Sequence, residues 1–347
     1  MFKTKIWGVA AAIMLVAFGA MASNFRVADQ VYIPIAGHVQ GGSALFVSDV
    51  FISNLSGDSV SISILYGQQN GKGAFQAFQN KITLAPNERK EFVDFFTTVL
   101  PEISGPFGLL VFNACKAGAD CTPDPATGEN ANFRPISVES RIYAVPCVGT
   151  GCAQSTPATA ASNGQDMPGI PWYNFVSSSE NAAGLAKVFI TGLRNNAGYR
   201  SNLGVVNASQ FSSTQIIATL RNGATGAQVG DQKVFNLAPL TFEQPNIAAA
   251  FNLANATNPP TTNLYVDIEQ GPSTPTGDAS TNGCADGCPA YLAFGSVLDN
   301  QTSDPTTAEA QYKQALTTTQ IACIYNPDLA NCALKAGAKT LHRAVKH

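Results

Sequence analysis

The chain has 347 residues, only 12% of them are charged, and the formal net charge is −3 at pH 7. So small a charge gives no electrostatic case for nucleic-acid binding. With 45% hydrophobic residues and 20 phenylalanines the chain is not a disordered protein, and its many Ser, Thr, Asn, Gln and Gly residues are typical of exported β-proteins.

The N-terminus predicts a secretory signal peptide. Lys3 and Lys5 precede an apolar run over residues 6–21, and Ala20-Met21-Ala22 is a small-x-small cleavage pattern. A membrane anchor is the alternative, but the run is close to the lower limit of about 17 residues for a membrane-spanning helix, and no charge cluster follows it. We therefore predict cleavage after residue 22, no transmembrane anchor in the mature chain, and export to the periplasm, the cell surface or the extracellular space.

Short strand-like segments separated by turn residues follow in close succession. In one of them Val60, Ile62, Ile64 and Tyr66 alternate with the serines at 59, 61 and 63, which is the period of two that a half-buried strand requires. Residues 90–99 fit either a strand or a short helical turn across the end of a sandwich. The predicted strands of the first half are 31–38, 44–53, 60–66, 75–84, 109–113 and 136–145.

The stretch of residues 49–86 recurs without a gap at residues 202–239. Both copies follow a serine, open with a six-residue strand-like segment and close with Leu-Ala-Pro. Matching anchors with strand-like residues between them predict a duplicated folding unit. The predicted strands of the second half, in the same order as in the first, are 188–192, 202–207, 214–220, 232–237, 263–269 and 291–298.

About seven short strands in each half, at turn spacings near ten residues, favour an all-β fold of two tandem immunoglobulin-like antiparallel β-sandwich domains. The Cys…Trp…Cys core of antibody domains is absent. Residues 308–325 and 329–345 have helical composition, which predicts a small helical C-terminal extension. The predicted organisation is a signal peptide (1–22), a first sandwich (23–147), a linker (148–180), a second sandwich (181–305) and a helical tail (306–347).

The eight cysteines form four close pairs, which in an oxidising compartment predict local disulfide bonds. Many connectivities are compatible with eight cysteines, so the local pairing is a hypothesis. A metal site is the alternative, but no pair has histidines at ligand spacing. The predicted pairs are Cys115–Cys121, Cys147–Cys152, Cys284–Cys288 and Cys323–Cys332.

Trp172 and Tyr173 are the candidate ligand contacts, because exposed aromatic rings bury a large area on a sugar or peptide at low entropic cost. The alternative is that these rings pack between the two domains. His38 is the one histidine before the tail. A catalytic histidine needs a nucleophile or carboxylate partner, and no such motif accompanies it, so we favour a hydrogen-bonded structural role.

Asp278, Asn282 and Asp286 are weak candidates for a calcium site, because hard oxygen ligands are spaced along a Gly-rich loop. A second group of such residues follows the last strand, at Asp299, Asn300 and Asp304. Neither stretch matches the calcium-binding loop motif, and Asx turns explain the same residues without a metal. We predict no catalytic residue, no metal site and no cofactor.

Three segments resemble parts of uncharacterised secreted bacterial proteins with tandem immunoglobulin-like sandwich repeats. The segments are residues 33–41 (IPIAGHVQG), 200–207 (RSNLGVVN) and 296–305 (SVLDNQTSDP). The resemblance covers residues 31–307 and implies the sandwich fold and the exported location. It implies no activity.

These observations predict a non-enzymatic exported structural, adhesive or protein-binding module of the cell envelope or extracellular space. Its expected partners are envelope or extracellular proteins or polysaccharides, and self-association through strand edges is a further expectation. A carbohydrate-binding module using Trp172 and Tyr173 is the first alternative. A secreted hydrolase with paired acidic residues in a cleft is the second.

Overall fold

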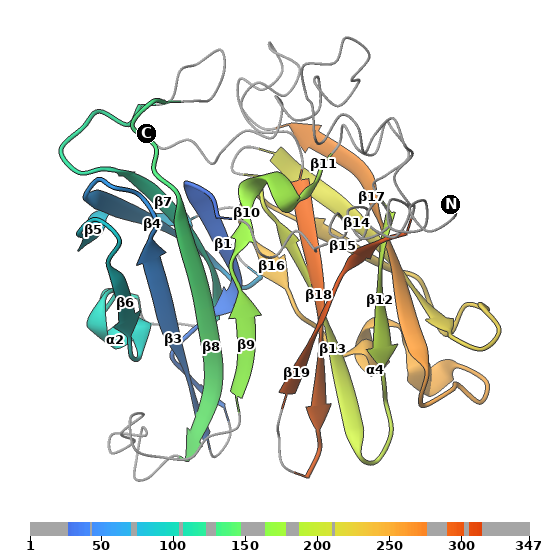
Figure 1. The fold of residues 1–347 in the computed structure, drawn as a ribbon. Coiled ribbons are helices and arrows are strands. Elements are labelled where there is room, and N and C mark those ends of the chain that lie inside the picture. The colour runs from blue at the N-terminus through green and yellow to red at the C-terminus, as the bar shows by residue number, and fades with distance from the viewer. Residues whose placement is uncertain are drawn as a thin grey trace, which may run out of the picture.

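The structure, a computed structural model (Figure 1), describes residues 27–41, 44–70, 75–103, 107–122, 130–146, 164–177, 187–209, 212–275, 290–301 and 305–313. The predicted signal peptide lies outside these residues. The described chain is all-β, its strand pairs are antiparallel, and its α-helices are single turns, α2 (Phe95–Thr98) and α4 (Ile247–Ala250). None of its helices is long and apolar enough to cross a membrane.

The first half of the described chain forms the strands β1 (Gln30–Ala36), β2 (Val39–Gly41), β3 (Ala44–Asn54), β4 (Val60–Gln68), β5 (Phe75–Leu84), β6 (Arg89–Phe92), β7 (Gly108–Lys116), β8 (Ile136–Pro146), β9 (Gly164–Pro168) and β10 (Ile170–Pro171). We call these strands unit one. Sheet 1 has the order β2-β3-β8-β9, with β6 also paired to β3, and sheet 2 has the order β10-β1-β7-β4-β5.

The second half begins with a 3₁₀ turn, η3 (Trp172–Asn174), and forms the strands β11 (Val176–Ser177), β12 (Lys187–Leu193), β13 (Tyr199–Asn207), β14 (Ser212–Asn222), β15 (Lys233–Leu237), β16 (Phe242–Glu243), β17 (Leu264–Pro275), β18 (Ala290–Asp299), β19 (Pro305–Glu309) and β20 (Gln311–Tyr312). A second 3₁₀ turn, η4 (Leu253–Asn255), follows α4. We call these strands unit two. Sheet 3 has the order β11-β18-β13-β16, with β19 also paired to β18, and sheet 4 has the order β20-β12-β17-β14-β15.

The two units repeat one strand order, and the repeat extends into the segments that the sequence assigned to the linker and to the helical tail. After β8 the chain adds β9 beside it and then crosses to pair β10 with β1; after β18 it adds β19 and then pairs β20 with β12. The described part of the predicted linker, residues 164–177, therefore forms strands and a 3₁₀ turn. The predicted helix from residue 308 is contradicted at residues 308–312, because β12 and β18 offer unpaired edges and their pairing overrides local helical composition. The remainder of the predicted tail lies outside the described residues.

An asparagine closes the same corner in each unit. Asn54 donates from Nδ2 to the carbonyl of Ala85 at 2.8 Å, and its Oδ1 accepts the N–H of Ser56 at 2.9 Å. Asn207 makes the equivalent bonds, to Ala238 at 3.0 Å and from Ser209 at 2.9 Å. These buried amides satisfy backbone groups that the strand ladder leaves open, which explains why the sequence repeats there.

Each unit has β-sandwich character, with alternate residues of the central strands buried between its two sheets. Figure 1 shows the units side by side, unit one from blue to green and unit two from yellow-green to red, with β9 next to β19. The larger hydrophobic core continues from unit one into sheet 3, because Val206, Phe242, Leu292 and Phe294 belong to it. The immunoglobulin-like identity of the sandwiches stays a prediction. Residues 90–99 contain both expected structures, the strand β6 and the helical turn α2.

Candidate functional site

The outer face of sheet 2 is apolar where unit two covers it. Tyr32, Leu65 and Val111 lie on neighbouring strands of this face and are buried. The hydroxyl of Tyr32 donates to the carbonyl of Ala208 in unit two at 3.4 Å. Gly67 approaches unit two so closely that an added Cβ would lie 1.8 Å from a backbone oxygen of Leu240.

The same face becomes polar further along the strands and forms a groove of about 730 Å³. Ser61 and Ser63 of β4 and Asn113 of β7 replace the apolar side chains of the covered part. A volume of this size is typical of small-molecule sites. The lining residues are Asp29, Ser61, Ser63, Asn80, Thr83, Asn113, Ala114, Cys115, Lys116, Ala117, Gly118, Ala119, Asp120, Cys121, Thr122 and Phe133.

A β-bulge in the edge strand β5 shapes one side of the groove. The register of β4 and β5 shifts between Ile62 and Ile64, and Asn80 adopts a left-handed backbone conformation with φ 50°. Ser63 Oγ accepts the Asn80 N–H at 3.0 Å, and Ser61 Oγ donates to Asn80 Oδ1 at 2.8 Å. In unit two, the equivalent ladder between β14 and β15 has no such shift over its paired residues. Bulges often accompany binding sites, because they redirect a side chain.

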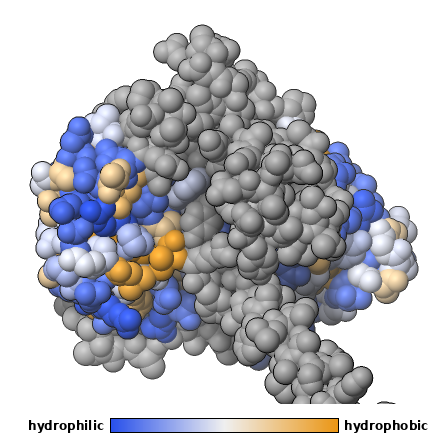
Figure 2. Space-filling model, turned by 45° about the horizontal axis from the view of Figure 1, so that its top comes forward, coloured by the Kyte–Doolittle hydropathy of each residue, from blue (hydrophilic) through white to orange (hydrophobic). Residues whose placement is uncertain are grey.

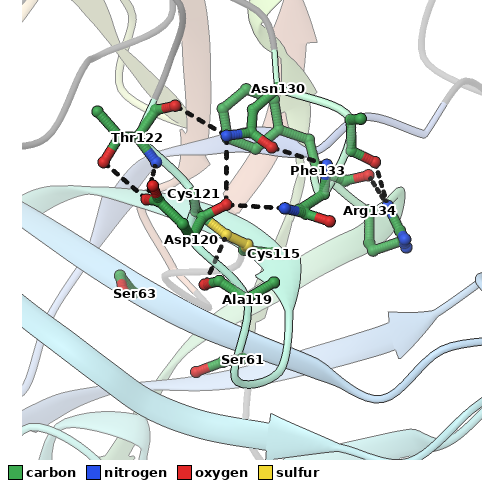
Figure 3. The surroundings of a disulfide bond; sticks show 12 residues. Ser61, Ser63, Cys115, Ala119, Asp120, Cys121, Thr122, Asn130, Phe133 and Arg134 are labelled. Carbon is green, nitrogen blue, oxygen red and sulfur yellow. Dashed lines mark hydrogen bonds between the residues drawn. A yellow bond between two sulfur atoms is a disulfide. The ribbon is translucent and has the colours of Figure 1, made fainter.

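The disulfide bond Cys115–Cys121, which the sequence predicts, closes a loop over Ser61 and Ser63 (Figure 3). Beyond this loop, Asn130 donates from Nδ2 to the carbonyls of Asp120 at 3.2 Å and Thr122 at 2.8 Å. Asn132 also donates to the Asp120 carbonyl, at 2.9 Å. The loop that lines the groove is therefore held by a covalent bond and by side-chain amides, which preorganises the wall.

Two carboxylates near the groove are stabilised in their charged form. The backbone N–H and the hydroxyl of Thr122 lower the pKa of Asp120. Hydrogen bonds from Lys116 and then from Arg134 lower the pKa of Asp58. A protonated carboxyl that could act as a general acid requires a pKa shift in the opposite direction.

Trp172 lies beside the groove instead of forming an exposed platform. Its indole N–H donates to Asp29 Oδ1 at 3.1 Å, and its ring is partly buried against the larger core. The ring therefore packs against the protein core, and Asp29 connects it to the groove. The backbone of Tyr173 lies in η3, and its side chain lies outside the described residues.

The other predicted site residues divide into two groups. Asp299 Oδ1 accepts the N–H of Gln301 at 2.7 Å, which is the Asx-turn bond expected without a metal. Asn300 Oδ1 instead accepts from the guanidinium of Arg200 at 2.7 Å, a side-chain bond between distant residues. No metal-ligating cluster of His, Cys, Asp or Glu occurs among the described residues. The second group lies outside these residues: Asp278, Asn282, Asp286, Asp304, Cys147, Cys152, Cys284, Cys288, Cys323 and Cys332.

A group of ionisable residues at a break in the edge of sheet 1 escaped the sequence analysis. His38 Nδ1 lies 2.9 Å from Asp94 Oδ1, the Asp94 N–H donates to Asp49 Oδ1 at 2.8 Å, and the Tyr143 hydroxyl donates to the same oxygen at 3.0 Å. Burial, and then the Asp49 charge, raise the pKa of Tyr143. His38 is hydrogen-bonded, as the sequence analysis favoured. Its partner, Asp94, is 56 residues away in the chain, so no local motif predicts the pair.

Unit two has amides at the equivalent places. Asn246 precedes α4 as Asp94 precedes α2, and Asn202 occupies the position of Asp49 on its strand. Asn246 Nδ2 lies 3.5 Å from Asn202 Oδ1, a longer contact without charge. The fold therefore forms this corner without ionisable groups.

Comparisons with known proteins identify no family. No family model and no curated sequence matches the chain. Among solved structures, a cryo-EM structure of Broad Bean Stain Virus has 7% identity and a TM-score of 0.21, covering 86% of this chain and 94% of the other. The lectin from Pleurotus ostreatus in complex with GalNAc has 11% identity and a TM-score of 0.18, covering 83% and 77%. The CBM22-1–CBM22-2 tandem domain of Paenibacillus barcinonensis Xyn10C has 10% identity and a TM-score of 0.17, covering 80% and 81%. Similarities this low carry no argument about this chain.

Proposed function

We propose that this chain is an exported, non-enzymatic binding protein that holds a saccharide chain in the groove of unit one. The observation that supports the proposal is the change along one sheet face from a sealed apolar surface to an open groove lined by hydroxyl, amide and carboxylate groups. Such groups pair with the alternating donors and acceptors of a polyhydroxylated ligand. Binding an envelope polysaccharide would give the protein the adhesive role that its sequence predicts.

The distribution of exposed apolar side chains favours a polar ligand over a large protein partner. Among the described residues, the large apolar side chains that are at least 36% exposed are scattered over both units: Val27, Phe51, Leu55, Val93, Val234 and Tyr312. On the face shown in Figure 2, hydrophilic residues dominate the coloured surface, and apolar residues gather in a small patch. Stable protein interfaces have a larger buried apolar centre.

The charge state of the groove favours binding over hydrolysis. A glycosidase needs one carboxyl with a raised pKa to protonate the leaving group. The pKa of Asp120 in the groove is lowered, because its Oδ1 accepts hydrogen bonds from the N–H and the hydroxyl of Thr122. A carboxylate of this kind accepts hydrogen bonds from sugar hydroxyls.

The test is a titration of the mature protein, residues 23–347, with cellohexaose, xylohexaose, mannohexaose and N-acetylchitohexaose. Trp172 reports binding, because it is the one tryptophan left after signal cleavage and its indole contacts Asp29. We expect saturable heat and a saturable fluorescence change with at least one hexasaccharide. A folded protein that binds none of them, nor its host's envelope polysaccharide, would overturn the proposal.

A hydroxyl-deletion variant locates the site. Thr83→Val removes one groove hydroxyl from an exposed strand position while keeping the side-chain shape. We expect affinity to fall about threefold to tenfold, since a net hydrogen bond contributes about 0.5–1.5 kcal/mol. Thr191→Val is the matched control, because Thr191 is an exposed strand threonine of unit two. It should bind like the wild type.

A further inference from the structure

A chain of hydrogen bonds runs from unit two into the wall of the groove. The Tyr32 hydroxyl lies 3.4 Å from the carbonyl of Ala208 in unit two and 3.2 Å from Gln30 Oε1, and donates toward both. Gln30 Nε2 in turn donates to Asn113 Oδ1 at 2.5 Å. Asn113 lines the groove.

This chain sets the direction of the Asn113 amide. Because the Gln30 oxygen accepts from Tyr32, its NH₂ group faces Asn113, and the Asn113 oxygen must face Gln30. The Asn113 Nδ2 is then the end left for the groove, and it is buried without a hydrogen-bond partner among the described residues. An unsatisfied buried donor is unfavourable, and a bound acceptor oxygen would recover part of that cost.

The chain of bonds is shielded and rigid. Gln30 and Tyr32 are each 1% exposed. The Tyr32 ring also meets the Phe175 ring edge to face, with centroids 4.5 Å apart. A buried hydrogen-bond network of this kind holds its members in one arrangement.

The equivalent positions of unit two show that the fold does not require this chain. By strand register, Lys187, Phe189 and Glu269 replace Gln30, Tyr32 and Asn113. Phe189 has no hydroxyl, and Lys187 and Glu269 form a surface ion pair. The bonds are therefore particular to the unit that has the groove.

We infer that Tyr32 and Gln30 are positioning residues, through which the docking of unit two fixes Asn113 as a hydrogen-bond donor to the ligand. The inference rests on the proposed function and makes it more specific: the ligand presents an acceptor oxygen, such as a sugar hydroxyl or ring oxygen, at Asn113. The groove is then complete only in the docked two-unit protein.

The test compares Tyr32→Phe with Tyr291→Phe, using the hexasaccharide that the wild type binds most tightly. Both tyrosines are buried, and each hydroxyl lies 3.4 Å from a backbone carbonyl, but Tyr291 contacts Ile268 within unit two. We expect Tyr32→Phe to weaken binding about fivefold and Tyr291→Phe to leave it unchanged. Asn113→Asp, which replaces the donor by an acceptor, should weaken binding more than tenfold.

Three outcomes are distinguishable. If the wild type binds and Tyr32→Phe binds equally well, or if both tyrosine variants weaken binding alike, the positioning role is wrong while the proposed function stands. If the wild type binds neither a hexasaccharide nor its host's envelope polysaccharide, the proposed function fails first. The positioning role is then judged by ¹⁵N NMR of the ligand-free protein: the Asn113 side-chain NH₂ signals should shift in Tyr32→Phe and not in Tyr291→Phe, and unshifted signals in both would overturn it.

Discussion

Sheets 2 and 4 are repeats of one another, but among the described residues the other unit covers the outer face of sheet 2 and not that of sheet 4. Strand register makes Val111 equivalent to Asp267 and Gly67 equivalent to Arg221. The sheet 2 members of these pairs are apolar or lack a side chain, and they face unit two. The sheet 4 members form an ion pair that Lys313 extends, with its Nζ 2.9 Å from Asp267 Oδ2.

Sheets 3 and 1 differ in the same way. Phe294 and Phe242 of sheet 3 are buried in the core shared by the units. Their register equivalents in sheet 1 are Glu139 and Arg89, both exposed. The faces of sheets 2 and 3 that contact each other are thus apolar. The equivalent faces of sheets 4 and 1, which lie away from this contact, carry charged residues.

This difference between the faces limits how copies of the duplicated fold can associate. The contact joins the outer face of one sheet type to the outer face of the other, so it is head-to-tail. Repeated between chains, it would produce a ring or an open filament. Charges at the equivalent positions oppose that repetition, because burying them would remove them from water, which costs free energy even for paired charges. We therefore expect the wild type not to polymerise through these faces. Any self-association of the kind predicted from the sequence should then use strand edges.

The largest expected effect comes from placing a sheet 1 charge at the sheet 3 contact. Phe294→Glu buries a carboxylate in the shared core, and we expect the free energy of unfolding to fall by about 4 kcal/mol or more. Glu139→Phe is the reciprocal control and should change it by less than about 0.5 kcal/mol, since Glu139 is exposed. Urea unfolding followed by circular dichroism measures both, and equal values for the two would show that the faces do not differ.

The close approach of the units at Gly67 predicts a somewhat smaller effect. Gly67→Ala places a methyl group on the Leu240 carbonyl and should lower the free energy of unfolding by about 2–4 kcal/mol. Gly57→Ala is the matched control, because an added Cβ there meets nothing within 4 Å. Thermal unfolding of the two variants side by side tests the contact, which is absent if both melt like the wild type.

Removing the charges from both outward faces should permit association. The change combines Asp267→Val and Arg221→Gly on sheet 4 with Glu139→Phe and Arg89→Phe on sheet 1. Sedimentation velocity should show concentration-dependent growth for the combined variant and little for either pair of changes alone, because a head-to-tail contact needs both faces. Filaments of the wild type at low concentration would contradict the role given to these charges.

The ionisable corner of unit one predicts an effect on alkaline titration. The pKa of Tyr143 is raised in the folded protein, so its contribution to stability is fully present below the ordinary tyrosine pKa near 10. This contribution is lost as the pH rises through the pKa of the folded state. Asp49→Asn, which copies Asn202 of unit two, should lower the Tyr143 pKa, although burial keeps it above the ordinary value. Absorbance at 295 nm, with Tyr143→Phe subtracted, measures this pKa, and an unchanged value would show that the Asp49 charge does not act on Tyr143.

The smallest expected effect concerns acid. The pKa of Asp58 is lowered by Lys116 and Arg134, so its contribution to stability is present above the ordinary carboxyl pKa and is lost as the pH falls through the lowered one. Asp58→Asn should therefore be slightly less stable than the wild type at pH 7, and the two should converge toward pH 2. Because Asp58 is well exposed, the difference at pH 7 should shrink in high salt. A difference that persisted at pH 2 would have another cause.

The sequence determined the features that depend on neighbouring residues. The period of two in Val60, Ile62 and Ile64 is enough to place β4, because alternate side chains of a strand face opposite sides. The recurring asparagine corner identifies the duplication, since Asn54 and Asn207 satisfy groups within their own copies. The Cys115–Cys121 bond was predictable because its partners are six residues apart.

Other features join residues that are far apart in the sequence, and these depend on the tertiary structure. Residues 305–309 and 311–312 are strands because they pair with edges of sheets 3 and 4, which no local composition reveals. The groove needs Asp29, Ser61 and Asn113 together, from three separate strands or turns, and the bonds from Tyr32 to Ala208 cross between units. Local propensity acts over a few residues, whereas edge pairing, burial and such hydrogen bonds are settled by whichever surfaces the folded chain brings into contact.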